Sequence, residues 1–164
     1  MKGTRTVVKK LAVLYKNFGN AASWLQSPLL LLVRLYWGWQ FMQTGWGKLQ
    51  HLDRVIGFFH SLGIPFPGIQ APLVAGMEFF GGLLLILGLG SRLVGLILAF
   101  DMLVAYWTAS RDALFSVISN PGQFYNADPY TFLFASLMVL IFGAGLFSID
   151  TLIARVFGDK FAHS

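Results

Sequence analysis

The chain has 164 residues, of which 56% are hydrophobic and only 12% are charged. A soluble domain of this length cannot bury so much apolar surface, so the composition predicts a single-domain membrane protein. Cysteine is absent, which excludes disulfides, thiol redox chemistry and cysteine-bound zinc or iron–sulfur centres in this chain. The formal net charge of +5 would suit a nucleic-acid partner unless the basic residues serve membrane topology.

The first segment, residues 1–27, is rich in basic residues. Apolar residues recur at helical spacing from Val7 to Phe18. This pattern predicts an amphipathic helix that lies on an anionic membrane surface and ends near Gly19–Asn20. A disordered basic tail is the alternative. A cleaved secretory signal is not predicted, because Arg34 interrupts the apolar run that follows and no small-residue cleavage pattern comes after it.

A first membrane span is predicted from about Pro28 to Gly47, with Ser27 as its cap. One face of this helix carries Arg34, Gly38, Phe41, Gly45 and Lys48, and Gln40 and Gln43 lie beside that face. The next segment, Lys48 to Leu62, is too short and too polar to span and is predicted as an interfacial helix. The sequence GIPFPG then turns the chain, because two prolines one residue apart prevent a continuing helix.

Three further spans are predicted in the second half of the chain. They run from Pro72 to Gly90, from Leu93 to Ala109, and from Pro129 to about Phe147. The tight connection at residues 90–92 makes the second and third spans antiparallel, and a polar loop, Arg111 to Asp128, precedes the fourth. Residues 28–150 therefore predict an all-α, four-helix transmembrane bundle. Residues 151–164 predict a short C-terminal helix, capped by Asp150, and a tail.

Glycines within the spans predict places where neighbouring helices approach closely. These helix-packing candidates are Gly38, Gly45, Gly81, Gly82, Gly143 and Gly145. The cluster around Gly143 is not a dinucleotide-binding fingerprint, since no strand precedes it.

The distribution of Lys and Arg predicts the orientation of the bundle. Eight of these residues fall on the side of the N-terminus, and three, Lys48, Arg54 and Arg111, fall on the opposite side. The positive-inside rule therefore predicts that both termini are cytoplasmic. Membrane topology thus accounts for most of the positive charge, and no nucleic-acid partner is predicted.

Three ionisable residues lie within the predicted spans, namely Arg34, Glu78 and Asp101. Each lone charge at mid-bilayer costs about 2.5–3.5 kcal/mol, so we expect the three to meet in one layer. Arg34 is expected to pair with one acid, and the other acid is expected to be protonated; the sequence does not decide which. The candidates for ligand binding or proton coupling are Arg34, Glu78, Asp101, Gln40, Gln43 and Lys48.

Three interpretations of this cluster stay open. It locks the helix register, or it binds a ligand, proton or quinone, or it lines a lipid-headgroup or water-filled pocket. His51 and His60 lie on opposite faces of their helix, so no metal site is predicted. No pattern of catalytic residues is present.

Four motifs in order resemble the DoxX family of small bacterial and archaeal membrane proteins with four spanning helices. The motifs are Arg34 to Leu49, Ser61 to Gly68, Met77 to Arg92 and Gly143 to Asp150. The resemblance covers about residues 29–150. It implies a membrane subunit associated with oxidoreductase systems, and relatives assemble with soluble thiol- or superoxide-handling enzymes. Distant relatives are cargo receptors, so the fold alone does not fix the activity.

The leading hypothesis is an inner-membrane subunit of, or accessory to, a quinone-linked oxidoreductase, whose polar cluster binds a quinone or another lipophilic ligand. Its expected partners are the bilayer, a soluble oxidoreductase or redox-defence enzyme, and a second copy of the chain. The alternative is non-enzymatic: a membrane scaffold, or a small-molecule or proton-coupled transporter. The sequence does not establish whether the chain has catalytic turnover.

Overall fold

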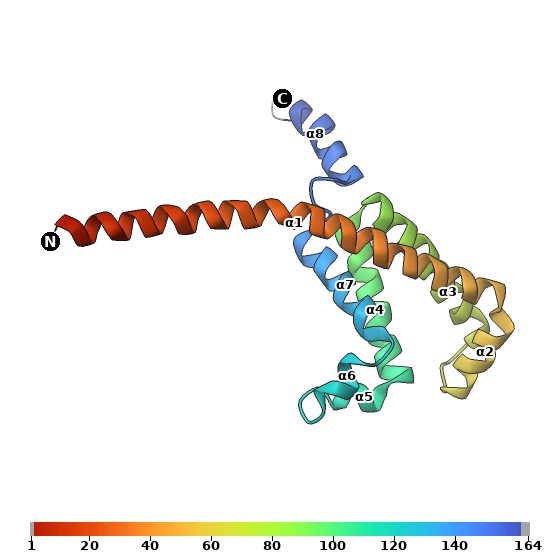
Figure 1. Cartoon of the computed structure of the whole chain (residues 1–164). Helices are drawn as coiled ribbons and strands as arrows, with labels where there is room; N and C mark the ends of the chain where they lie inside the picture. The colour runs from red at the N-terminus through yellow and green to blue at the C-terminus, as the bar shows by residue number, and fades with distance from the viewer. Residues whose placement is uncertain (1, 162–164) are drawn as a thin grey trace.

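Helices make up all of the regular structure in the described part of the chain. The computed structural model describes the backbone of residues 2–161 and the side-chain surroundings of residues 13–19 and 22–156. Figure 1 shows the arrangement. The elements are α1 (Lys2–Gln50), α2 (Leu52–Ser61), α3 (Pro67–Leu87), α4 (Ser91–Ala109), α5 (Arg111–Phe115), α6 (Pro121–Tyr125), α7 (Pro129–Phe142) and α8 (Ile149–Phe161). The all-α fold class is therefore confirmed.

The helix α1 is continuous for 49 residues, with Pro28 in its interior. The expected end near Gly19–Asn20 is therefore wrong, because a glycine inside a helix costs only about 1 kcal/mol and does not by itself end it. Residues 13–26 are exposed wherever they are described, and Figure 1 shows this part of α1 extending away from the other helices. The side chains at positions 7–12, on which much of the expected amphipathic stripe depends, lie outside the described residues.

The segment after α1 forms the separate short helix that its spacing predicts. The apolar residues Leu52, Ile56 and Phe59 are half-buried on α2, while its polar residues are exposed. The chain then turns at the proline-rich stretch, where Phe66 has a left-handed backbone conformation with φ of 51°. Pro67 occupies the first turn of α3, where its missing N–H is harmless. This helix thus begins five residues before the expected Pro72.

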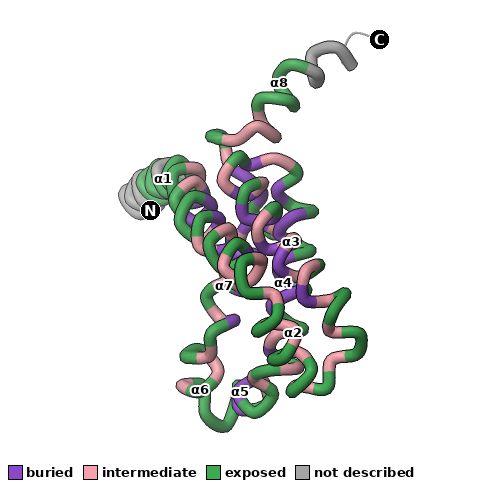
Figure 2. The backbone as a smooth tube through the Cα atoms, turned by 90° about the vertical axis from the view of Figure 1, so that its right-hand side faces the viewer, coloured by how far each residue is buried: buried purple, intermediate pink, exposed green. Residues whose placement is uncertain are grey.

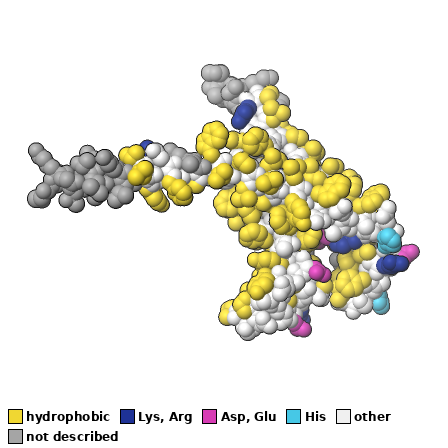
Figure 3. Space-filling view, in the orientation of Figure 1, with side chains coloured by type: hydrophobic (Ala, Val, Ile, Leu, Met, Phe, Trp, Pro, Cys, Tyr) yellow, Lys and Arg dark blue, Asp and Glu magenta, His cyan; other side chains and the backbone are white. Residues whose placement is uncertain are grey.

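Two helices, α3 and α4, are long and apolar enough to cross a membrane. Only 33% and 39% of their most apolar stretches are buried inside the protein. The core helix of a soluble protein would bury most of that surface, so the outward apolar faces fit a lipid environment. Figure 2 shows buried backbone on the inward faces of the bundle, and Figure 3 shows hydrophobic side chains covering its middle.

The other two predicted spans, residues 28–47 and 129–147, are not established by length and composition. Arg34 and two glutamines lower the hydropathy of the first. The second is shorter than expected, because α7 has 14 residues and ends at Phe142. At a rise of 1.5 Å per residue it covers about 21 Å of the roughly 30 Å hydrocarbon layer. Gly143 and Gly145, with φ of 79° and 74°, follow its end, so they are not packing positions within a span. Gly145 still lies close to α1, because a Cβ added there would lie 3.3 Å from Ser27 Cα.

The bundle is held by close backbone approach between α1 and α3. A Cβ atom added at Gly38 would lie 2.8 Å from the carbonyl oxygen of Gly82. One added at Gly45 would lie 2.7 Å from the carbonyl oxygen of Ala75. The order of these pairs makes the two helices antiparallel. On the other side, α4 packs mainly on α7, and α3 joins α4 through a tight turn at residues 88–90, two residues before the connection predicted at residues 90–92.

The variant Gly45→Ala is expected to destabilise the protein by about 1–3 kcal/mol, because its new methyl group would force α1 away from α3. Gly47, two residues along the same helix, has no atom within 4 Å of an added Cβ, so Gly47→Ala is the matched control. That control should be neutral or stabilising by up to about 1 kcal/mol. Thermal unfolding of both variants in nanodiscs measures the difference; equal midpoints would contradict this packing.

Candidate functional site

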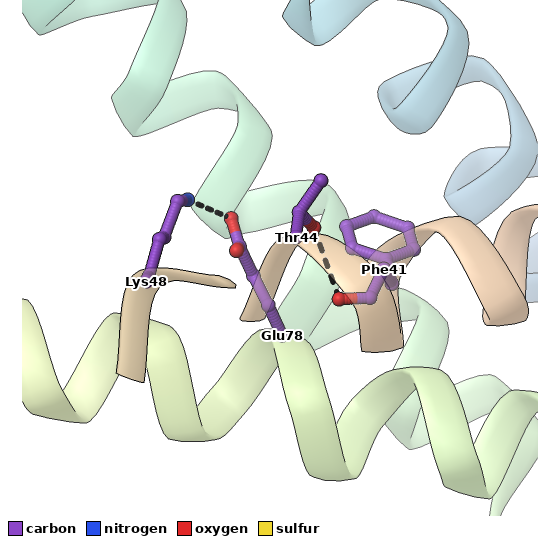
Figure 4. Close-up of polar contacts among 4 residues, drawn as sticks. All are labelled: Phe41, Thr44, Lys48 and Glu78. Atoms are coloured by element: carbon purple, nitrogen blue, oxygen red, sulfur yellow. Dashed lines mark hydrogen bonds and ion pairs between the residues drawn. The ribbon is translucent and has the colours of Figure 1, made fainter. Parts of the chain in front are cut away.

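A buried ion pair joins α1 to α3. Lys48 Nζ lies 2.5 Å from Glu78 Oε1 (Figure 4). Glu78 is only 2% exposed, whereas the side chain of Lys48 is about one-third exposed. Thr44 lies beside the pair, but its hydroxyl donates to the carbonyl oxygen of Phe41, at 2.9 Å. The pair therefore places a glutamate inside the bundle with its charge balanced by a lysine that is partly accessible.

Asp101 of α4 is the second acid of this region. It is 7% exposed and lines the same cavity as Lys48 and Glu78. Among the described residues, Glu78 Oε2 and Asp101 Oδ2 have no hydrogen-bond partner. Buried polar atoms are normally paired, so two free carboxylate oxygens next to one cavity mark a candidate ligand-binding position.

Arg34 does not join this cluster, so the expectation that it pairs with Glu78 or Asp101 in one layer is wrong. Arg34 is 1% exposed, and its guanidinium donates to backbone carbonyls instead. The acceptors are Leu85 O at 3.0 Å, Phe147 O at 2.9 Å, Ile86 O at 3.4 Å, and Ala144 O. Carbonyl oxygens at the end of a helix carry partial negative charge, so the end of α3 can stabilise a buried arginine without an ion pair to Glu78 or Asp101.

Asp150 and Arg34 together form a second group of charged residues, at the other end of the bundle. The carboxylate of Asp150 accepts hydrogen bonds from Gly90 N at 2.7 Å and Ser91 N at 2.8 Å, and so caps α4. Partial burial alone would raise the pKa of Asp150, but these backbone donors and the charge of Arg34 hold it below its ordinary value. The expected capping of α8 by Asp150 is wrong, because Ser148 Oγ accepts from Thr151 N instead, at 3.2 Å.

Of the six candidate residues, the structure brings together Lys48, Glu78 and Asp101. Gln43 is exposed on α1 and Gln40 is half-buried, and neither lines a cavity beside Glu78. Among the described residues, no group of three or more His, Asp or Glu side chains is arranged to hold a metal ion.

Two cavities meet at the ion pair. The α2 cavity, about 360 Å³, lies between α2, α3 and α4. The α7 cavity, about 740 Å³, lies between α1, α4 and the start of α7. Lys48, Glu78, Phe58 and Met102 line both of them. The remaining walls are mainly apolar, as in most small-molecule sites.

The cavity walls contain residues that were not among the sequence candidates. Ala105 and Thr108 follow Asp101 at helical spacing of four and seven residues, so its position on α4 already indicated that they share its face. Phe58 belongs to α2, and no pattern in the sequence indicated that α2 folds over Glu78. Only the three-dimensional structure shows that this short, exposed helix forms part of the cavity wall.

Both cavities open toward the end of the bundle that carries α2, α5 and α6. Exposed residues such as Arg54, Phe58 and Ala109 stand among their lining residues. In the other half of the bundle, Leu85, Leu98 and Val139 are 0–1% exposed and close the interior. The acidic pair therefore lies between this end, where exposed residues line the cavities, and a closely packed interior on the other side.

These features define an all-helical membrane protein with a buried ion pair beside an apolar cavity. A protein-family model described as DoxX matches residues 29–111, just over half of the chain. The chain belongs to the DoxX family, so the resemblance seen in the motifs is confirmed. The motif at residues 143–150 lies beyond the matched residues.

Relatives from bacteria agree with this assignment. The Bacillus subtilis (strain 168) protein named "Putative oxidoreductase CatD" is 30% identical over 125 residues, which cover 76% of this chain and 87% of that protein. "Inner membrane protein YqjF" of Escherichia coli (strain K12) is 30% identical over 132 residues, covering 80% and 96%. "Inner membrane protein YphA" of the same organism is 27% identical over 142 residues, covering 83% and 95%. These names support a bacterial membrane location. No solved structure matches the chain.

Access to the cavities from the end that carries α2, α5 and α6 can be tested with cysteine labelling, because the chain has no cysteine of its own. Thr108→Cys places a thiol in the α2 cavity, whereas Ser136→Cys places one at a position that is 0% exposed in the closed half. A small, charged methanethiosulfonate reagent, applied to sealed vesicles of each orientation, is expected to label the first variant from one face only. The second variant should stay unlabelled from both faces. Labelling of either variant from both faces would contradict a closed inner end.

Proposed function

We propose that this chain is an integral membrane subunit of, or accessory to, a quinone-linked oxidoreductase system. In this proposal the α2 cavity binds a quinone or another lipophilic ligand. The observation that carries it is an apolar cavity that ends at Lys48, Glu78 and Asp101, with two unpartnered carboxylate oxygens. An apolar ring would occupy the walls, and its polar groups would meet the charged residues.

The residues present indicate which tasks the protein would perform and which the quinone would perform. A quinone carries electrons itself, so the protein needs to supply only binding, orientation and groups that hold protons. Lys48 can donate to a ligand oxygen, and the two carboxylates can accept. The name of the Bacillus subtilis relative, which mentions an oxidoreductase, supports this class of function.

The proposal includes a four-span topology with both termini in the cytoplasm. It is supported by the antiparallel order of α1, α3, α4 and α7 and by the excess of Lys and Arg near the N-terminus. With this orientation the entrance to the cavities faces away from the cytoplasm. A soluble oxidoreductase that works with this chain would then reach the site from that face.

Mass spectrometry of the purified protein tests the proposal. The chain would be extracted into native nanodiscs with its own lipids, and the quinone content would be measured relative to phospholipid. The wild-type protein is expected to carry quinone well above the level of the surrounding membrane. Asp101→Asn should lower that excess at least several-fold, because it changes the polar end of the cavity. Asp53→Asn, which alters an exposed carboxylate on α2 outside the cavity, is the matched control.

Other outcomes would favour the non-enzymatic alternatives. If the wild type shows no excess of quinone, and a soluble enzyme copurifies with wild type and Glu78→Gln alike, the chain is a scaffold. If reconstituted vesicles accumulate a solute and Glu78→Gln abolishes the accumulation, the chain is a transporter. Either result would overturn the proposed role in a quinone-linked oxidoreductase system.

A further inference from the structure

The hydrogen-bonding groups at the end of the α2 cavity restrict the chemistry of its ligand. Glu78 uses one carboxylate oxygen to pair with Lys48 and leaves Oε2 free. Asp101 leaves Oδ2 free, and its side chain is more than nine-tenths buried. A buried acceptor without a partner is unfavourable, so a ligand that donates a hydrogen bond there would gain more than one that does not.

Lys48 adds the opposite requirement. Its ammonium group has three N–H donors, of which one is directed at Glu78 Oε1, and the side chain is about one-third exposed. It therefore favours a ligand group that accepts. Lys48, Glu78 and Asp101 together favour a ligand group that accepts a hydrogen bond from an ammonium and also donates one to a carboxylate.

A hydroxyl group meets both demands, since its one O–H can donate to one of the two free carboxylate oxygens and its lone pairs can accept from Lys48. A carbonyl or an ether can only accept and would leave both carboxylate oxygens unpaired, so these groups fit the reduced, hydroxyl form of a quinone better than the oxidised form. A ligand ammonium can only donate and would be repelled by Lys48. A ligand anion would meet two carboxylates.

The walls of the cavity indicate the chemistry of the rest of the ligand. Phe58, Phe59, Leu62 and Val74 surround the space next to the charged end. Aromatic and branched aliphatic side chains favour a flat ring with an apolar tail. We infer that the α2 cavity takes a neutral aromatic alcohol with an apolar chain, its hydroxyl group lying between Lys48, Glu78 and Asp101.

This inference rests on the proposed lipophilic site and specifies the class of ligand within it. Two probes separate the two claims. para-Nonylphenol carries the hydroxyl group, and para-nonylanisole is the same molecule with that group methylated, so it has the apolar part but no donor. Binding of radiolabelled nonylphenol to the full chain in nanodiscs would be measured, with each unlabelled compound as competitor and empty nanodiscs as the background.

The expected result is saturable binding of nonylphenol, with nonylanisole at least about tenfold weaker as a competitor, because it loses a hydrogen bond to a charged group. Asp101→Asn and Glu78→Gln should each reduce this preference, whereas Asp53→Asn should preserve it. The comparison of probes on the wild type does not depend on any variant folding.

The possible failures are distinguishable. Equal competition by the two compounds would overturn the inference about the hydroxyl group while leaving a lipophilic site in place. A preference that survives both acid substitutions would overturn the assignment to Glu78 and Asp101. Absence of saturable nonylphenol binding would overturn the inference, and the same result together with absence of copurified quinone would overturn the proposed function itself.

Discussion

The close contact between α1 and α3 is the constraint on which the rest of the structure depends. Gly38 faces Gly82 and Gly45 faces Ala75, so the two antiparallel helices lie nearly backbone to backbone. Helical side chains tilt toward the N-terminus of their own helix, so Lys48, one turn beyond Gly45, reaches back toward the level of Glu78. The glycines therefore set the register that creates the ion pair. The same glycines thus determine both the close packing of α1 on α3 and the position of the Lys48–Glu78 ion pair.

The bundle stabilises its buried ionic groups in three different ways. Arg34 is surrounded by carbonyl oxygens at the end of α3 and in the segment after α7. Glu78 is paired with a lysine. Asp101 has neither kind of partner, and its Oδ2 accepts no hydrogen bond. Glu78 Oε2 also lacks a partner, so Arg34 alone is fully satisfied, and both incomplete acids lie beside the α2 cavity, where a ligand can complete them.

Much of this organisation could be predicted from the sequence. Apolar composition, the GIPFPG turn and helical spacing indicated an all-helical chain, the separate helix α2 and the antiparallel α3–α4 pair. The presence of Glu78 in a polar cluster followed from the cost of a lone charge in a bilayer. Lys48 was among the candidates, since it shares a helix face with Gly45.

The choice of partners could not be predicted. At a rise of about 1.5 Å per residue, the predicted spans place Arg34 roughly 9 Å and Glu78 roughly 18 Å below the same end of the bundle, a gap that a long side chain can bridge. What decides the outcome is the early end of α7: the glycines after Phe142 turn the backbone so that Ala144 and Phe147 present carbonyls to Arg34. Backbone acceptors leave no signal in a residue pattern, and neither does the fold of α2 over the cavity.

The central claim is that Glu78 is paired with Lys48 and is independent of Arg34. Two double-mutant cycles, measured by unfolding in nanodiscs, test it most directly: Lys48→Met with Glu78→Gln, and Arg34→Leu with Glu78→Gln. The first pair should show a coupling energy of about 0.5–3 kcal/mol, and the second pair should be additive within about 0.5 kcal/mol. Coupling in the second cycle and additivity in the first would contradict the account.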